Sequence, residues 1–214
     1  PVISAVSIVS SNSASSTLAK ADDVITLSFT SDVAVQTPAV TIAGRDATVA
    51  SSTNPNSFTA STTALVADSG SVTFSITALS LTGDNSVAVI ATDDHSAVTF
   101  DNTPPAITIT SGPAGGSVST SSPTEFAFTI DAGATAVCAF DGAATSSCSG
   151  SFSQALADGS HFFSVVATDS PGNAAATTTS FTLDTTPPSL SITSGPADGA
   201  TISTSSVSFI FATD

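Results

Sequence analysis

The sequence has very few basic residues and no Met, Trp or Tyr. Lys20 and Arg45 are the only strong bases among 214 residues, against 17 Asp and Glu, so the formal net charge is −15. Binding a nucleic acid or an anionic membrane surface requires neutralising Lys and Arg side chains, so both partners are excluded. The acid excess is explained by solubility, because carboxylates at turns keep a large β surface hydrated and mutually repelling.

Long hydrophobic runs are also missing. The longest, such as residues 87–91 and 209–212, are far shorter than the roughly 20 residues that span a bilayer as a helix. We therefore expect no membrane span in this segment. The sequence opens at Pro1 rather than Met and stops at Asp214, and we expect both ends to be cuts in a longer chain.

Catalytic motifs are not found. No GxSxG elbow surrounds a serine, and no Gly-rich phosphate loop precedes a helix. His161 alternates in phase with Phe163, which places its ring at the core or its rim, and His95 is expected in a polar turn. A Ser, a His and an Asp occur within residues 158–161, but on one hairpin they favour a turn over a charge-relay site. We expect no enzyme, no catalytic residue and no required cofactor.

Alternating β-branched, aromatic and small polar residues are abundant, and this period of two predicts strands separated by turn residues. About seven short strands per unit, with frequent turn signals and no amphipathic helix, are typical of an antiparallel sandwich. The sequence therefore predicts an all-β protein of tandem immunoglobulin-like antiparallel β-sandwich domains. The predicted strands lie at residues 24–29, 40–42, 72–76 and 87–89, and at 107–109, 126–130, 163–167 and 181–183.

One stretch of about two dozen residues occurs twice. TFDNTPPAITITSGPAGGSVSTSS begins at Thr99, and TLDTTPPSLSITSGPADGATISTSS begins at Thr182. The spacing is the size of one small domain, so the stretch is interpreted as a repeated domain junction. It predicts domains at residues 1–103 and 104–186, and the first strands of a truncated third domain at 187–214.

The junctions contain paired prolines, and we predict that they are stiff. Proline fixes its own φ and restricts the residue before it, so Pro104-Pro105 and Pro187-Pro188 have few accessible conformations. Short turns are predicted within the domains as well. Asp141-Gly142 and Asp158-Gly159 supply residues that tolerate positive φ, as tight hairpins require.

The two cysteines predict a disulfide. Cys138 and Cys148 flank the Asp141-Gly142 turn, so in a hairpin they approach from its two arms. Closing such a loop is worth roughly 2.5–3 kcal/mol on the chain-entropy estimate. The alternative is a pair of buried free thiols, as in a reducing cytosol. A zinc site would need two more ligands, and no CxxC or paired His supplies them.

The chain resembles the bacterial-type immunoglobulin-like (Big-like) repeats of extracellular surface proteins, adhesins and filaments. The features that match are CAFDGAATSSC, LADGSH, VVATDSPGN and DTTPP in the second domain, and VITLSFTSD, VTIAGRDATV and DNTPP in the first. The sequence departs from antibody-type domains, because it has no strand-C Trp and no corner Tyr. Similar modules occur in the flagellar hairs called mastigonemes.

The resemblance implies a structural, non-enzymatic segment of a stalk, fibre or cell-surface filament, with neighbouring modules or copies as partners. The alternative is an adhesin or a carbohydrate- or protein-binding module, although sugar platforms use exposed Trp and Tyr, which are absent. Surface Ser and Thr are candidate sites for O-linked glycans. Calcium at the junctions is a further alternative, because hard cations bind clustered carboxylates; the candidates are Asp93, Asp94, Asp101, Asp169 and Asp184.

Overall fold

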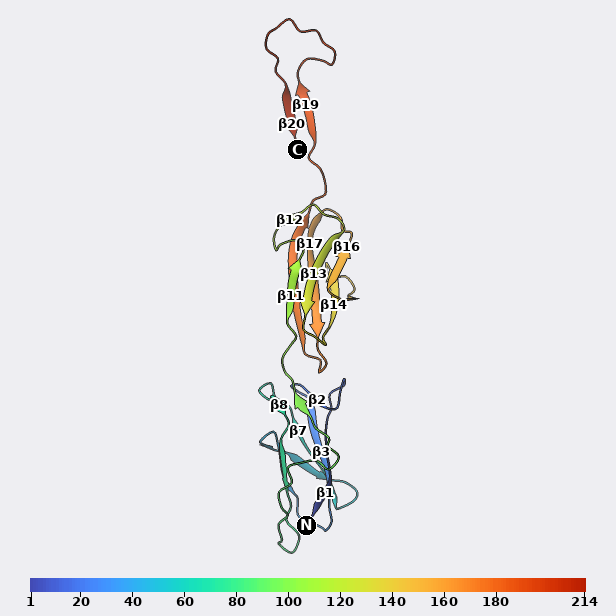
Figure 1. Cartoon of the computed structure of the whole chain (residues 1–214), viewed down its shortest axis with the longest axis vertical. Coiled ribbons are helices and arrows are strands. Elements are labelled where there is room, and N and C mark those ends of the chain that lie inside the picture. Colours follow the sequence, from blue (N-terminus) through green and yellow to red (C-terminus); the bar gives the residue numbers. More distant parts are fainter.

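The computed structural model describes all residues from Pro1 to Asp214, and it consists of β-strands, turns and loops. Two β-sandwiches and a terminal β-hairpin follow one another along one axis and form a rod (Figure 1). The structure contains no helix of the length and hydrophobicity that crossing a membrane requires. The predicted all-β class is confirmed.

The first domain has two layers of strands. One layer is the four-stranded sheet β1-β3-β7-β6, and the other comprises the sheets β2-β10-β8 and β5-β4-β9. Strands β8 and β9 are two pieces of one strand, interrupted at Val72 and Thr73, so the second layer is continuous. The strands are β1 (Ile3–Ser10), β2 (Leu18–Ala19), β3 (Val24–Ser31), β4 (Ala39–Ile42), β5 (Arg45–Asp46), β6 (Thr48–Ser51), β7 (Ser57–Thr63), β8 (Gly70–Ser71), β9 (Phe74–Thr77) and β10 (Thr99–Phe100).

The second domain repeats this arrangement. The sheet β11-β13-β16 packs against the five-stranded sheet β12-β18-β17-β14-β15. Strand β12 runs parallel to β18, as β2 runs parallel to β10, and the remaining pairs are antiparallel. The strands are β11 (Ile107–Ser111), β12 (Val118–Ser119), β13 (Thr124–Ile130), β14 (Thr135–Phe140), β15 (Ser146–Cys148), β16 (Ser151–Gln154), β17 (Gly159–Thr168) and β18 (Ala174–Leu183).

This strand order defines the fold. In an immunoglobulin-like sandwich, strands A, B, E and D form one sheet and strands G, F and C form the other. The sheet β1-β3-β7-β6 has the order A-B-E-D, and β18-β17-β14 has the order G-F-C. Both domains are therefore immunoglobulin-like sandwiches, as predicted.

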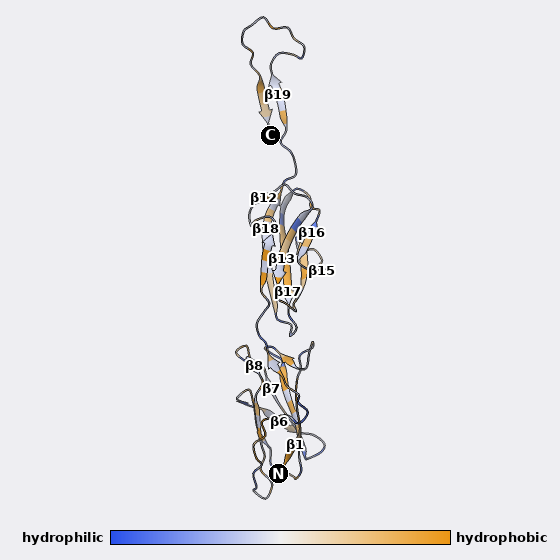
Figure 2. Cartoon of the chain, in the orientation of Figure 1, coloured by the Kyte–Doolittle hydropathy of each residue, from blue (hydrophilic) through white to orange (hydrophobic).

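Alternation along the strands places apolar side chains between the two layers, and Figure 2 shows hydrophobic and hydrophilic segments alternating along them. The first core is a cluster of 16 buried residues, mostly aliphatic, with Phe29 stacked on Phe58 at 5.6 Å between ring centroids. The second core contains nine buried residues and is rich in Phe. Its centre is the stacked pair Phe126 and Phe163, whose centroids lie 4.5 Å apart.

The last unit contains two strands, β19 (Leu190–Ser194) and β20 (Ile210–Thr213). They pair in the register of β11 and β13, including the irregularity near the end of the first strand. Gly112 in the second domain has φ +134°, and a Cβ there would overlap the Phe126 ring; Gly195 stands in the same relation to Phe209. The hairpin therefore repeats the first two long strands of the preceding domain.

Two sequence predictions are wrong in detail. Residues 87–89 form a single bridge, Val89 with Ile76, rather than a strand. Next to this bridge the pairing is irregular: the Ser86 amide donates to the Ala78 carbonyl at 2.7 Å, but the Ala78 amide donates to the Ser86 hydroxyl at 2.8 Å rather than to a backbone carbonyl. Gly159 does not lie in a tight hairpin turn either; it begins β17 with φ +143°. Residues 141–142, in contrast, both have the predicted positive φ.

Candidate functional site

The linker that leaves the first domain is tied to that domain by its polar side chains. The Asp101 carboxylate accepts the Thr103 amide at 3.0 Å. Asn102 accepts the Ala21 amide at Oδ1 (2.5 Å) and donates from Nδ2 to the Asp68 carbonyl (2.8 Å). The residues before the prolines are therefore fixed by hydrogen bonds.

Asp68 is itself held firmly, because its carboxylate receives two hydrogen bonds from the Arg45 guanidinium, at 2.6 and 2.7 Å. These bonds and the charge of Arg45 lower the pKa of Asp68 below its ordinary value and raise the pKa of Arg45. The loop that anchors the first linker thus remains ionically paired through the neutral pH range.

An aspartate holds the chain again at the start of each unit. In each unit, the backbone amide directly after the opening proline or proline pair donates to an Asp carboxylate at 2.7–2.8 Å. That Asp directly follows the second long strand of the same unit. The bond fixes where the first strand begins relative to its partner. The pairs are Val2 with Asp32, Ala106 with Asp131, and Ser189 with Asp214.

The second linker is held by a different side chain. Asp158, in the loop before β17, accepts the Thr185 amide and hydroxyl at Oδ1 (2.8 and 2.7 Å) and the Thr186 hydroxyl at Oδ2 (2.7 Å). The hydrogen bonds from Thr186 and Thr185 lower the pKa of Asp158 below its ordinary value. The loop before β17 is therefore the anchor of the second linker.

The prolines themselves differ between the two linkers. Pro104 is exposed and Pro105 is buried, whereas Pro187 and Pro188 are both exposed. The stiffness predicted for these four residues remains a prediction.

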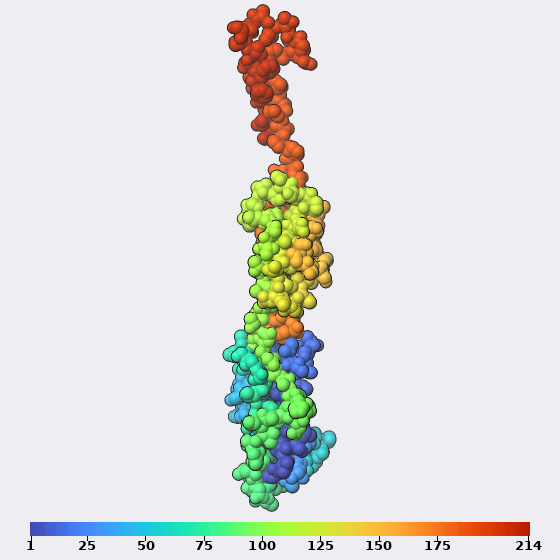
Figure 3. All heavy atoms as spheres, viewed as in Figure 1, coloured from blue at the N-terminus to red at the C-terminus, as the bar shows by residue number.

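The turn between β17 and β18 reaches back to the first domain. In Figure 3 the orange atoms of this turn lie between the body of the second domain and the first domain. Two asparagines cross the junction in opposite directions. Asn12 of the first domain donates from Nδ2 to the Pro171 carbonyl, and Asn173 of the second donates from Nδ2 to the Asp101 carbonyl, both at 2.9 Å.

Each asparagine is oriented by its own domain. Asn12 Nδ2 also donates to the Asp23 carboxylate (2.8 Å), and Asn173 Nδ2 donates to the Asp169 carboxylate (2.9 Å). Asn12 is buried, with 8% of its surface exposed, and Pro171 is buried too. If the domains shifted while Asn12 stayed covered, one Nδ2 hydrogen would lose its carbonyl partner, so the paired arrangement favours one relative position of the domains. We call these residues, Asn12, Asp23, Asp101, Asp169, Pro171 and Asn173, the junction latch.

The junction also contains one of the two cations. Lys20 lies beside Asp23, with Nζ 3.9 Å from Oδ1, and a Cβ on Gly172 would lie 3.5 Å from Lys20 Cε. Gly172 has φ +93° and its amide donates to Asp169 Oδ1 at 2.9 Å. The positive φ favours glycine at this position, and a Cβ there would be in ordinary contact with the lysine side chain.

The predicted disulfide between Cys138 and Cys148 is present, with the two Cα atoms 5.9 Å apart. It joins β14 to β15 across the turn at residues 141–142. Cys138 is fully buried in the second core and Cys148 packs against it. The bridge therefore closes a hairpin at the edge of the larger sheet of the second domain.

His161 forms no side-chain hydrogen bond with the Ser or the Asp of residues 158–161. Its Nδ1 lies 2.8 Å from Asp141 Oδ2, and its Nε2 lies 2.7 Å from the Ala157 carbonyl. Its ring packs beside Phe181 at the rim of the core, as the alternation predicted. His95 lies exposed in a turn, with φ +60°. No serine hydroxyl hydrogen-bonds to either ring, so the geometry offers no charge relay.

The five aspartates considered for calcium have other partners. No three His, Cys, Asp or Glu side chains gather in a group suited to a metal ion. Asp93 accepts the Val6 amide and Asp94 accepts the Ser96 amide, while Asp101, Asp169 and Asp184 hold turns. Asp93 therefore bonds to β1, and the other four bond to backbone amides close by in sequence.

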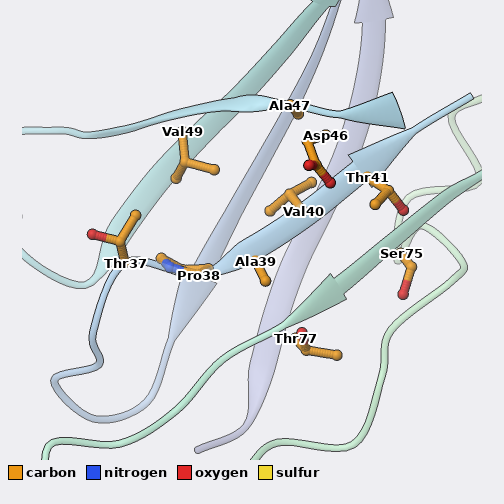
Figure 4. Close-up of a pocket in the computed structure, with 10 residues that line it drawn as sticks. All are labelled: Thr37, Pro38, Ala39, Val40, Thr41, Asp46, Ala47, Val49, Ser75 and Thr77. Atoms are coloured by element: carbon orange, nitrogen blue, oxygen red, sulfur yellow. The ribbon is translucent and has the colours of Figure 1, made fainter. Parts of the chain in front are cut away.

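The surface has shallow hollows. One of about 400 Å³ lies over β4, β5 and β9 of the first domain. Its lining side chains are short, and Asp46 is its one ionisable group (Figure 4). A lone exposed carboxylate provides neither an acid–base pair nor a set of metal ligands. The junction is therefore the candidate functional site.

Comparisons with known proteins found distant structural similarities. No family model and no curated protein sequence matches the chain. Among solved structures, it is similar to fibronectin(III)-like modules of Clostridium thermocellum CbhA, with 16% identity and a TM-score of 0.40, covering 82% of this chain and 92% of the other. It is also similar to an I-band fragment of titin, with 10% identity and a TM-score of 0.44, covering 78% of this chain and 62% of the other. A fragment of intimin matches with 11% identity and a TM-score of 0.32, covering 81% of this chain and 98% of the other. The immunoglobulin-like assignment depends on strand order rather than on these distant similarities.

Sequence reasoning predicted the junctions and missed the residues that bridge them. The repeated Asp before each proline pair pointed to the linkers. Asn12 is a single Asn in a Ser-rich loop, and nothing in its neighbourhood indicates a partner about 160 residues away. Asp32, Asp131 and Asp214 follow similar strands, and that repetition was a usable signal.

Proposed function

We propose that this chain is a structural, non-enzymatic segment of a long extracellular repeat protein of the bacterial immunoglobulin-like type. Its domains would be stacked end to end as a stalk, fibre or cell-surface filament, including filaments of the flagellar-hair kind. The observation that carries this proposal is the junction latch. Its reciprocal amide–carbonyl bonds favour one relative position of two domains, which is what a spacer of fixed length needs.

Other features are consistent with this role. A disulfide persists in oxidising compartments such as the cell exterior. Apart from Glu125, Arg45 and Asp46, the charged residues of the two complete domains lie in turns, loops and strand ends, and the sheet faces carry mainly Ser, Thr, Ala and Val. We propose that these uncharged faces permit neighbouring copies to approach, and that exposed Ser and Thr accept O-linked glycans.

The latch can be tested by removing both asparagines. In an Asn12→Ala/Asn173→Ala variant, we expect each domain to stay folded and the domains to reorient, because each cross-domain bond loses its donor. Small-angle scattering and residual dipolar couplings should show a broader distribution of interdomain angles. Asn85→Ala is the matched control, since its exposed side chain forms no hydrogen bond in the structure.

Two results would contradict the proposal. One is an unmodified chain whose residual dipolar couplings fit domains that tumble independently. The other is an unmodified chain that turns over a substrate. Specific retention on glycan or protein surfaces by single domains would instead favour the alternative of an adhesin or binding module.

A further inference from the structure

The surroundings of His161 favour a ring that carries two protons. A backbone carbonyl accepts hydrogen bonds and cannot donate them, and the same holds for an ionised carboxylate. Nε2 faces the Ala157 carbonyl at 2.7 Å and Nδ1 faces Asp141 Oδ2 at 2.8 Å. A neutral imidazole has one N–H, so one nitrogen lone pair would then point at an oxygen. The imidazolium satisfies both contacts.

The loop that receives the Nε2 bond is also the loop that holds the second linker. Ala157 precedes Asp158, whose carboxylate binds Thr185 and Thr186. His161 thus hydrogen-bonds to the backbone of Ala157, the residue before the Asp158 side chain that holds the linker. On the other side, Asp141 is fixed because its Oδ1 accepts the Phe162 amide at 2.9 Å.

We propose that His161 couples pH to the second linker: as the imidazolium it holds the Ala157–Asp158 loop against Thr185 and Thr186, and on losing the Nε2 proton to solvent, with the Nδ1–H kept by the Asp141 carboxylate, it releases that loop. His161 acts as a positioning residue, through the loop, without contacting the linker. This property goes beyond the proposed structural role, and it holds or fails whether or not the chain builds a filament.

The charged groups around the ring are few. Asp141, from the β14–β15 turn, faces Nδ1, and the loop before β17 presents the Ala157 carbonyl, with Asp158 turned toward the linker. Strand β18 contributes the Phe181 ring and has no ionisable residue. The hydrogen bond to Asp141 and that to Ala157 raise the pKa of His161 above its ordinary value of 6.5.

The first linker lacks this dependence. Its anchor is Asn102, an uncharged amide that bonds to backbone groups of Ala21, Leu65 and Asp68. An amide does not titrate, and the Arg45–Asp68 pair beneath it stays ionised from acidic to alkaline pH. The first linker is therefore an internal control for the second.

The test is an NMR titration of the whole chain between about pH 5.5 and 8.5. We expect the Thr185 and Thr186 amide shifts to move with the midpoint of the His161 ring protons, and the heteronuclear NOE of these amides to fall at high pH. The Asn102 and Thr103 amides should remain unchanged. Replacing His95 by Gln should leave all of these signals as they are.

Asp141→Asn separates proton coupling from simple structural damage. The new amide can still accept the Phe162 amide, and its NH₂ can donate to the lone pair of a neutral ring, so neutral His161 keeps both contacts. Asn also tolerates the φ of +54° at this position. We expect the midpoint of His161 to fall, and the linker to remain ordered at high pH.

Two outcomes would overturn the proposal. One is a His161 ring that titrates in the native chain while the Thr185 and Thr186 amides stay constant. The other is an Asp141→Asn chain whose linker amides still follow pH as in the native chain. Asp158→Asn gives a further check, because it should weaken the linker contacts at every pH and leave the His161 midpoint above that of Asp141→Asn.

Discussion

The two complete domains share one strand order but are stabilised differently. The first has the larger core, 16 buried residues, and a bidentate Arg45–Asp68 pair. The second has nine core residues, concentrates its Phe rings there and adds the disulfide. Since a smaller core removes less apolar surface from water, the comparison indicates that aromatic packing and a covalent bridge compensate in the second domain.

The two junctions share a linker sequence but have different surroundings. The same Asp-x-Thr-Pro-Pro sequence begins both linkers, but at the first the β17–β18 turn docks on the preceding domain and Pro105 is buried. At the second, the last unit consists of β19 and β20, and Pro188 is exposed. At the first junction, the surroundings of the linker are therefore set by contacts with residues far away in sequence.

The largest expected effect comes from Phe163→Ala in the second core. Phe163 is fully buried, and its ring centroid lies 4.5 Å from that of Phe126 and 5.4 Å from that of Phe140. Removing a buried Phe side chain costs about 3–5 kcal/mol, because it loses apolar burial and leaves a cavity. Hydrogen exchange followed by mass spectrometry should show faster opening of the second domain and an unchanged first domain.

Phe162→Ala is the matched control for this change, because Phe162 is the next residue and lies on the outer face, 37% exposed. It should cost far less. Equal losses for both variants would mean that the small aromatic core does not carry the stability of the second domain.

A smaller effect is expected on opening the disulfide. Closing the loop between Cys138 and Cys148 constrains the unfolded chain, and its loss should reduce the unfolding free energy of the second domain by about 2.5–3 kcal/mol. Denaturation with and without reductant, monitored by exchange in each domain, measures this loss. The first domain contains no cysteine and should unfold at the same denaturant concentration in both conditions. If both domains respond alike, the bridge does not compensate for the smaller core.

Local signals explain what could be predicted from sequence. Alternation found most strands, because one face of each sheet is buried, and the Asp141-Gly142 turn between two cysteines predicted the bridge. Alternation at residues 87–89 led to a wrong strand prediction, because alternation cannot show whether a partner strand lies alongside. The junction latch was missed because Asn12 and Pro171 meet only when two domains are stacked, and neither residue type indicates a distant partner.

The smallest expected effect is a pH dependence that distinguishes the domains. Hydrogen bonds to Asp141 and Ala157 raise the pKa of folded His161, so its contribution is complete below the unfolded pKa of about 6.5 and is lost as pH rises through the folded value. Burial alone would raise the pKa of Asp141, but bonds from His161 and Phe162 outweigh it and lower that pKa, so its contribution is lost only in acid. We therefore expect the second domain to lose stability as pH rises above the ordinary histidine pKa of about 6.5.

The first domain supplies the reference for that measurement. The pKa of Asp68 is lowered by its bonds from Arg45, so this pair loses its contribution only as pH falls well below the ordinary carboxyl range. Its unfolding free energy should stay level where that of the second domain declines, in parallel denaturation series across pH. Asp141→Asn should flatten the decline, because neutral His161 then keeps both partners. A decline of equal slope in both domains would assign the effect to the net charge of −15 rather than to His161.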